Sequence, residues 1–477
     1  MAPMPSLKMR WPVPGIVLPV TLAAILQVGQ ALPYPSSALA ALSVICTSEG
    51  TIEGAEFAFG AASPDPAPAP PIEGPVAPLA GMPPVINSNN LYSETTPSHL
   101  SPATVGALER VYVPEHGGNA VSVIDPKTLK VVDHFRVGLS PQHIVPSWDL
   151  KTLWATNNND FHRRGGGSLT PIDPITGKPG SNVPVDDPYN MYFMPDGSAA
   201  IVVNEANRRL EFRDPHNLKM LYSIDTPECY GINHADFSID GTFALFSCEF
   251  RGGVEKIDLV NRKAVGFLRL IKPDKSMTLP TGDFQARRSA ESGRRRWWHR
   301  RRSNGDVAAR PSTFRGMPQD IRISPDGKVF YVADMLADGV FVVDAYAMQQ
   351  IGFIPTGPGA HGFCVSRDGT RLYVSNRGSH AMPTGTPHGP GSVSVIDFST
   401  KRVMATWPIP GGGSPDMGGV SGDGAQLWFS GRFDDEVYVF DTGTGSVTKI
   451  KVGSEPHGLT VWPQPGRYSL GHTGILR

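Results

Sequence analysis

Seven polar residues that could bind a ligand or a metal ion occupy corresponding positions in a repeated pattern. In several copies a proline lies eight residues before a turn aspartate, as from Pro188 to Asp196 and from Pro318 to Asp326, and the next two residues begin an apolar run. The polar residues at these positions are His143, Asn190, His234, Asp320, His361, Asp416 and His457. Imidazole and carboxylate groups are ligands for zinc, copper or iron, and histidine carries protons near neutral pH.

The spacing of these residues in the sequence does not by itself make a metal site. The chain contains no His-Glu-x-x-His and no Cys-x-x-Cys motif. His143, His234, His361 and His457 are therefore candidate metal ligands only if the fold brings them together. The alternative is structural, with each polar group hydrogen-bonded to a neighbouring repeat or to water.

The clearest copy of the pattern runs from Ala360 to Pro410. Two runs rich in β-branched and aromatic residues flank the Asp368-Gly369 dipeptide, which suits a tight hairpin. A third run ends in Asp397, and a fourth ends in proline and glycine. This pattern predicts four short antiparallel strands in one sheet, which cannot bury both of its faces alone.

The pattern recurs seven times. The second run begins at residues 111, 153, 201, 245, 330, 372 and 427. An aspartate closes the third run at Asp125, Asp173, Asp214, Asp258, Asp344, Asp397 and Asp441. We expect these carboxylates to accept hydrogen bonds from the backbone of the following turn. Seven repeats of this length predict a ring of four-stranded blades.

The second runs resemble those of a known family. The sequences LYVSN at 372 and LWATN at 153 are similar to the Tyr-Val-Thr-Asn (YVTN) repeats of bacterial and archaeal β-propellers, the surface-layer and YncE-like proteins. The resemblance extends from Leu108 to Trp462 and implies an all-β, seven-bladed β-propeller of four-stranded antiparallel blades. Similar propellers, such as the haem-binding propeller of cytochrome-type nitrite reductase, use axial histidines. The resemblance therefore implies a transition metal or a tetrapyrrole as possible cofactors.

The two ends of the repeat region predict how the ring closes. The first repeat, residues 110–138, lacks a first run, and residues 455–462 supply a first run with nothing after it. We expect the C-terminal strand to pair into the first blade and remove the exposed sheet edges. In that ring the seven polar residues surround one mouth of the axial channel. The long loops 157–167 and 377–391 and an insertion at 271–317 emerge at the same face, where binding is expected.

The remaining sequence predicts export. Residues 1–40 have the layout of a secretory signal, with Lys8 and Arg10 before an apolar stretch and cleavage expected after residue 31 or 40; an uncleaved anchor is the alternative. Residues 41–104 form a Pro/Ala-rich linker, and the propeller occupies 105–477. The protein is expected to be secreted or associated with the cell envelope. Cys229 and Cys248 flank one hairpin and can form a disulfide there.

The net charge gives little indication of a general partner, because the sequence contains 43 basic and 44 acidic residues. The insertion contains an Arg-rich run at 287–302 that could bind a polyanion, or that is a solvated loop. We expect no specific nucleic acid and a monomer.

Two functions follow as hypotheses. In the first, the protein is an exported binding or scaffold module whose loop-rich face takes a protein, a glycan or a small anionic ligand. In the second, it is an extracytoplasmic metal- or tetrapyrrole-binding oxidoreductase or cofactor-handling protein that uses the axial His/Asp ring. No nucleophile–base pair is identifiable in the sequence.

Overall fold

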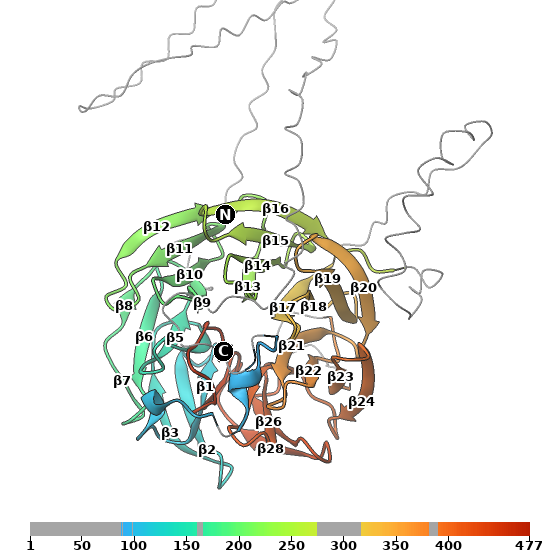
Figure 1. Ribbon diagram of the computed structural model, residues 1–477. Coiled ribbons are helices and arrows are strands. Elements are labelled where there is room, and N and C mark those ends of the chain that lie inside the picture. Colours follow the sequence, from blue (N-terminus) through green and yellow to red (C-terminus); the bar gives the residue numbers. More distant parts are fainter. Residues whose placement is uncertain (1–86, 88, 98, 160–165, 274–315, 381–389) are drawn as a thin grey trace, which may run out of the picture. The chain divides into compact units, whose positions relative to one another are not determined.

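Seven antiparallel sheets form a ring in the computed structural model, which describes residues 87, 89–97, 99–159, 166–273, 316–380 and 390–477 (Figure 1). The first sheet contains β1 (Arg110–Glu115), β2 (Ala120–Asp125), β3 (Lys130–Arg136) and β29 (Thr460–Trp462). The second contains β4 (Pro141–Pro146), β5 (Leu153–Asn157), β6 (Ser168–Asp173) and two short outer strands, β7 (Lys178–Pro179) and β8 (Val183–Pro184). The third contains β9 (Pro188–Phe193), β10 (Ala200–Asn204), β11 (Arg209–Arg213) and β12 (Met220–Asp225).

The other four sheets have the same order. The fourth contains β13 (Ile232–Phe237), β14 (Phe243–Cys248), β15 (Gly253–Asp258) and β16 (Lys263–Arg269). The fifth contains β17 (Pro318–Ile323), β18 (Val329–Asp334), β19 (Gly339–Asp344) and β20 (Gln349–Pro355). The sixth contains β21 (Ala360–Val365), β22 (Arg371–Asn376), β23 (Ser392–Asp397) and β24 (Arg402–Pro408). The seventh contains β25 (Pro415–Val420), β26 (Gln426–Gly431), β27 (Glu436–Asp441) and β28 (Val447–Lys451).

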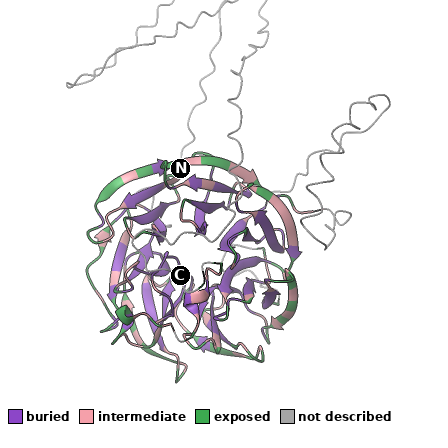
Figure 2. Cartoon of the chain, in the orientation of Figure 1, coloured by how far each residue is buried: buried purple, intermediate pink, exposed green. Residues whose placement is uncertain are grey.

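Burial follows the position of each strand in its sheet. The inner strands, such as β4 and β17, are buried at every residue, whereas the outer strand β24 alternates between exposed and half-buried residues. Figure 2 shows this as buried strands near the axis and exposed ones at the rim. Apolar side chains of neighbouring sheets pack together, so each sheet is covered on both faces, as four-stranded sheets in a ring require.

Turn chemistry explains why the chain reverses where it does. All seven closing aspartates accept hydrogen bonds from backbone N–H groups two or three residues later, as Asp125 does from Lys127 at 2.8 Å. This confirms the role predicted for them. Gly369 has φ +67°, the left-handed conformation that its hairpin turn requires. In the second sheet Leu150 adopts φ 64° at the corresponding place and is buried in the core.

The pairing of β29 with β1 closes the ring. Trp462 lies opposite Arg110 and Thr460 opposite Tyr112, so the C-terminal strand completes the first sheet as the sequence predicted. We call the end of the axis where the inner strands begin the entry end, and the other the exit end. The chain then continues across the exit end, where Leu470 accepts a hydrogen bond from Phe193 and Arg477 lies 2.6 Å from Asp236. Figure 1 shows the C-terminus near the centre of the ring.

Part of the segment predicted as linker packs on the ring instead. It contains two short 3-10 helices, η1 (Ser93–Thr95) and η2 (Pro102–Thr104). Tyr92 is 4% exposed, donates a hydrogen bond to the Ile323 carbonyl at 2.8 Å, and lies under the Arg477 guanidinium at 5.2 Å. A buried tyrosine whose hydroxyl is satisfied holds this segment at the exit end, beside the C-terminal tail.

Several predicted features lie outside the described residues. These are the signal segment, the linker up to residue 86, the Arg-rich run 287–302 and the middle of the two long loops. Among the residues that the structure describes, no helix has the length and apolar character needed to cross a membrane.

Closure can be tested at Trp462, which is 1% exposed and packs in the core beside Tyr112 and Leu476. We expect Trp462→Ala to lower the free energy of unfolding by about 3–5 kcal/mol, measured by urea denaturation, because it leaves a cavity at the closing strand. The control is Val132→Ala on the outer strand β3, which is 50% exposed and should change stability by less than about 0.5 kcal/mol. Equal effects of the two substitutions would contradict the closure model.

Candidate functional site

Irregular pairing turns the entry residues of the inner strands away from the regular ladder. In β17, Pro318 pairs with Asp334 and Ile321 with Val332, so the two residues between them leave the ladder, and β4, β13, β21 and β25 are irregular at the same place. Such bulges re-aim side chains. They leave the side chains of the sequence-predicted residues buried at the axis, with exposed fractions of 0% to 2%.

A hydroxyl from the second strand satisfies the backbone N–H at this irregularity in four sheets. Thr156, Ser247, Ser375 and Ser430 accept hydrogen bonds from the backbone N–H groups of His143, His234, Gly362 and Met417, respectively, at 2.7–3.4 Å. These hydroxyls belong to the Thr or Ser of the YVTN-like motif. The motif therefore has a physical role, because a buried N–H without a partner costs about 1–3 kcal/mol.

Five buried imidazoles meet at the axis. The ring centre of His143 lies 4.7 Å from that of His457 and 5.4 Å from that of His234. His361 lies 6.3 Å from His457 and 6.4 Å from His234. The fifth member is His472, 5.0 Å from both His143 and His234. His472 was not found from the sequence, because it follows the last repeat and only the path of the C-terminal tail brings it to the axis.

Two aspartate–arginine pairs hold the imidazoles. Asp416 accepts hydrogen bonds from Arg377 at 2.9 Å, and its carboxylate lies 2.6 Å from His361 Nδ1 and 3.5 Å from His457 Nε2. Asp320 accepts a hydrogen bond from Arg322 at 2.7 Å and lies 3.2 Å from His472 Nε2.

Burial alone would raise the pKa of Asp416, but Arg377 holds the pKa of this carboxyl well below its ordinary value, and Asp320 with Arg322 behaves in the same way. Both carboxylates are therefore charged near neutral pH.

The imidazoles are neutral near neutral pH. Burial is the main cause, and the Arg377 guanidinium adds to it at His361, whose pKa is lowered to about 4. Burial likewise lowers the pKa of His143, His234, His457 and His472. Neutral imidazole is the form that can bind a metal ion or accept a proton.

A cavity of about 570 Å³ opens at the entry end. Its lining includes His361 and His457, and also Gln142, Tyr189 and Gln319, which are the first residues of the entering pairs. Of the other residues predicted at this mouth, His143, Asn190, His234, Asp320 and Asp416 lie outside the lining of the cavity, buried within the ring. Asn190 hydrogen-bonds the Tyr192 hydroxyl at 3.3 Å.

The walls of the cavity are made by residues that sequence reasoning missed. Arg377 and Arg432 follow the second strands of the sixth and seventh sheets, and the aromatic residues Tyr230, Phe250 and Phe433 line it as well. Glu249 accepts hydrogen bonds from Asn233 at 2.8 Å and Gln319 at 3.1 Å, and burial raises its pKa. The signal that could have found them is position, because each lies just after a second strand or just before an inner one.

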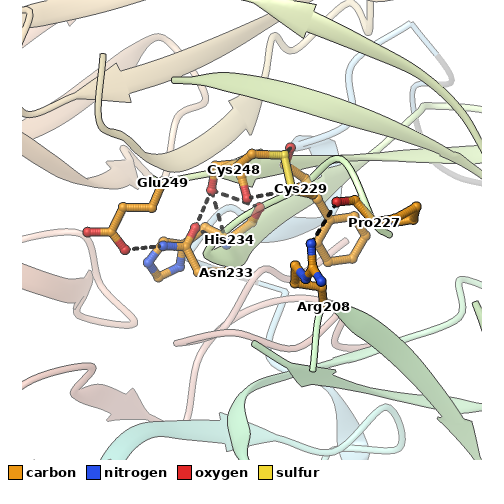
Figure 3. The surroundings of a disulfide bond; sticks show 9 residues. Arg208, Pro227, Cys229, Asn233, His234, Cys248 and Glu249 are labelled. Atoms are coloured by element: carbon orange, nitrogen blue, oxygen red, sulfur yellow. Dashed lines mark hydrogen bonds between the residues drawn. A yellow bond between two sulfur atoms is a disulfide. The ribbon is translucent and has the colours of Figure 1, made fainter. Parts of the chain in front are cut away.

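A disulfide between Cys229 and Cys248 joins this wall together (Figure 3). Their Cα atoms are 4.8 Å apart, and the next residues along the chain, Tyr230 and Glu249, both line the cavity. Cys248 lies opposite Ile232 in the ladder, so the chain before β13 turns back to bring Cys229 to it. The third described cysteine, Cys364, is a buried free thiol.

Seven blades around an axial site define a seven-bladed β-propeller. Residues 306–465, which include the last three blades, match the model of the family described as YNCE-like beta-propeller. The relationship to YncE-like propellers predicted from the repeats is thereby confirmed.

Solved structures agree with this fold. A functionally unknown protein from Desulfotomaculum acetoxidans has a TM-score of 0.51 at 15% identity, covering 74% of this chain and 98% of that one. A putative 6-phosphogluconolactonase from Bacteroides uniformis has a TM-score of 0.51 at 14% identity, covering 74% and 99%. The dihydro-heme d1 dehydrogenase NirN has a TM-score of 0.48 at 13% identity, covering 74% and 75%, and a score this low adds nothing to the assignment of the fold. No curated protein matches the chain. Identities this low show the fold alone, and a ligand has to be argued from the site.

Protonation of His361 should couple stability to pH. Its folded pKa of about 4 lies below the unfolded value of about 6.5, so below pH 6.5 the unfolded chain binds a proton that the folded protein does not. Stability is therefore complete above about pH 6.5 and falls by about 1.4 kcal/mol per pH unit as the pH drops toward 4. We expect the unfolding free energy of the wild type relative to His361→Gln to decrease by about 2 kcal/mol between pH 7 and pH 5, measured by urea denaturation. A difference that stays constant between pH 7 and pH 5 would contradict this coupling.

The disulfide should stabilise the cavity wall. Replacement of both cysteines by alanine removes a link across 19 residues, and we expect the free energy of unfolding to fall by about 3 kcal/mol. Reductant should destabilise the wild type by a similar amount and leave the double variant unchanged in urea denaturation. Equal sensitivity of both proteins to reductant would show that the bond contributes nothing.

Proposed function

We propose that the protein is an exported ligand-binding β-propeller whose entry-end cavity takes a small organic anion. The observation that carries this proposal is Arg432, a half-buried arginine in the cavity lining. In the part of the chain that the structure describes, its hydrogen bond is a long one, 3.4 Å to Gln142 Oε1, and no carboxylate is paired with it. The guanidinium is therefore available for the two parallel hydrogen bonds that carboxylates and phosphates accept.

The other charges of the cavity favour this assignment. Arg377 is held by Asp416, which fixes its position without removing it from the lining. Burial raises the pKa of Glu249, and two amides donate hydrogen bonds to its carboxylate. Asp187 accepts a backbone N–H from Ala206 at 2.6 Å. Two of the three acidic residues in the lining, Asp187 and Glu249, are thus engaged by neighbouring groups, with Glu205 as the third, and Arg432 supports the binding of an anion.

Aromatic residues at the rim indicate a ligand with an apolar body. Phe250 is 57% exposed and Tyr230 is 48% exposed, although both are large apolar side chains. Ligand cavities combine such surfaces with a few polar groups that orient the ligand, and this cavity is within the usual range of size. The export part of the proposal rests on the signal-like N-terminus and on the disulfide, which persists in oxidising compartments.

A second candidate is supported by the floor of the same cavity. The neutral imidazoles of His361 and His457 line the floor and could ligate the metal of a tetrapyrrole. In this arrangement Arg432 would bind the acidic side chains of the tetrapyrrole. This is the cofactor-handling alternative. It requires the two histidines as metal ligands, whereas binding of an organic anion rests on Arg432.

Binding of inorganic phosphate, citrate and haemin, measured by isothermal titration, tests both. We expect citrate or haemin to bind the wild type and Arg432→Gln to weaken that binding by about tenfold or more, because a charge-assisted hydrogen bond contributes about 1.5–3 kcal/mol. The exposed Arg262→Gln is the matched control and should bind as the wild type does.

Substitution of His361, in the floor of the cavity, distinguishes the two candidate functions. Loss of haemin binding in His361→Gln with citrate binding retained would favour the cofactor role. No binding of any of the three probes, or an affinity unchanged by Arg432→Gln, would overturn the proposal.

A further inference from the structure

Three imidazoles that do not line the cavity form a compact group within the ring. His143, His234 and His472 are each 0% exposed, and they come from β4, β13 and the C-terminal tail. Their ring centres are 5.4 Å, 5.0 Å and 5.0 Å apart. No other part of the proposed function uses them.

These spacings match a shared metal ion. A tetrahedral zinc ion holds imidazole nitrogens at about 2.1 Å, which places the ring centres about 3.2 Å from the ion and about 5.2 Å from one another. The observed separations differ from this value by a few tenths of an ångström. The ligand-capable atoms of His234, Asp320 and His472 all lie within 4.8 Å of one another, and the ring-centre distances alone add His143 to this group.

The three rings make few hydrogen bonds, and one of them, His472, is oriented by a carboxylate. One nitrogen of His472, Nε2, lies 3.2 Å from the Asp320 carboxylate, and Nδ1 of His234 lies 3.4 Å from the Asn190 amide. The second nitrogen of each ring, and both nitrogens of His143, have no hydrogen-bond partner in the structure. The Asp320 carboxylate orients the ring of His472 as carboxylates orient ligating histidines, and it leaves Nδ1 for the metal. His234 Nδ1 accepts from the Asn190 NH2 group, so Nδ1 carries the lone pair that a metal ion would take in place of this long hydrogen bond.

We propose that His143, His234 and His472 bind one divalent first-row transition-metal ion at the axis of the propeller, with Asp320 positioning His472. The residue types select nitrogen-binding ions of the Zn²⁺ or Cu²⁺ class over Ca²⁺ and Mg²⁺, which prefer oxygen. Buried polar nitrogens without partners destabilise the folded protein, and a bound ion removes that cost.

Nearby charges are compatible with a cation. Arg322 is paired with Asp320 and Arg477 with Asp236, so these two pairs together carry no net charge. Access is from the entry end, because His457, whose ring centre is 4.7 Å from that of His143, also lines the cavity. The C-terminal tail covers the exit end.

The test uses the full chain, stripped with a chelator, titrated with ZnCl₂ and analysed for metal after buffer exchange. We expect one equivalent of zinc in the wild type, and an affinity at least about tenfold lower in His143→Gln and in His472→Gln. The exposed His216→Gln is the matched control and should keep wild-type affinity. Circular dichroism and thermal unfolding establish that each variant is folded.

A second measurement does not depend on the variants. Cobalt substituted for zinc in the wild type should give the intense visible bands of a tetrahedral nitrogen-ligated ion. Substoichiometric zinc in the wild type, a cobalt spectrum like that of the aqueous ion, or unchanged affinity in the folded variants would overturn the site. Citrate binding in His472→Gln separates this outcome from failure of the cavity proposal, which does not involve His472.

Discussion

Hydrogen bonding between β29 and β1 joins the last strand of the ring to the first, and the contacts across the axis depend on it. The first blade has no inner strand of its own, so the last three strand residues supply it. Without that pairing, two sheets would expose their edges and the inner strands would not face one another. The position of the C-terminal tail also depends on this pairing, because His472 and Arg477 reach the axis only when Trp462 is fixed beside Arg110.

The side chains at the axis are polar, and neighbouring groups satisfy their hydrogen bonds and charges. Irregular pairing at the start of the inner strands turns side chains toward the centre, and hydroxyl groups of the second strands satisfy the backbone there. Two aspartate–arginine pairs then compensate the buried charges. Since desolvated ions need such partners, these pairs explain why Asp320 and Asp416 tolerate complete burial. The nitrogens left without partners are exceptions to this rule, and such exceptions are where a ligand is expected.

The entry end and the axis differ in chemistry. At the entry end, arginine, exposed aromatic rings and a disulfide-linked wall surround a cavity of about 570 Å³. Behind it, the imidazoles are buried within the ring, and this burial is the main cause that lowers their pKa and keeps them neutral near neutral pH. The two proposed sites, one for an organic anion and one for a metal ion, are connected through His457.

The amino-acid sequence by itself determined the strands, their turns, the seven repeats and the closing strand, because alternation, Asp-Gly turns and closing aspartates such as Asp125 act between residues close in the chain. It also determined that polar residues such as His143 and Asp416 begin the inner strands. Only the tertiary structure decided which of them meet. His472 follows the last repeat, so no repeat position marks it as a partner of the axis. Arg432 follows a second strand, but only the ring brings it to the cavity, and Asn190 binds neighbouring side chains instead of lining the cavity. Distances across a ring depend on its radius and on the path of the tail, which no local sequence pattern encodes.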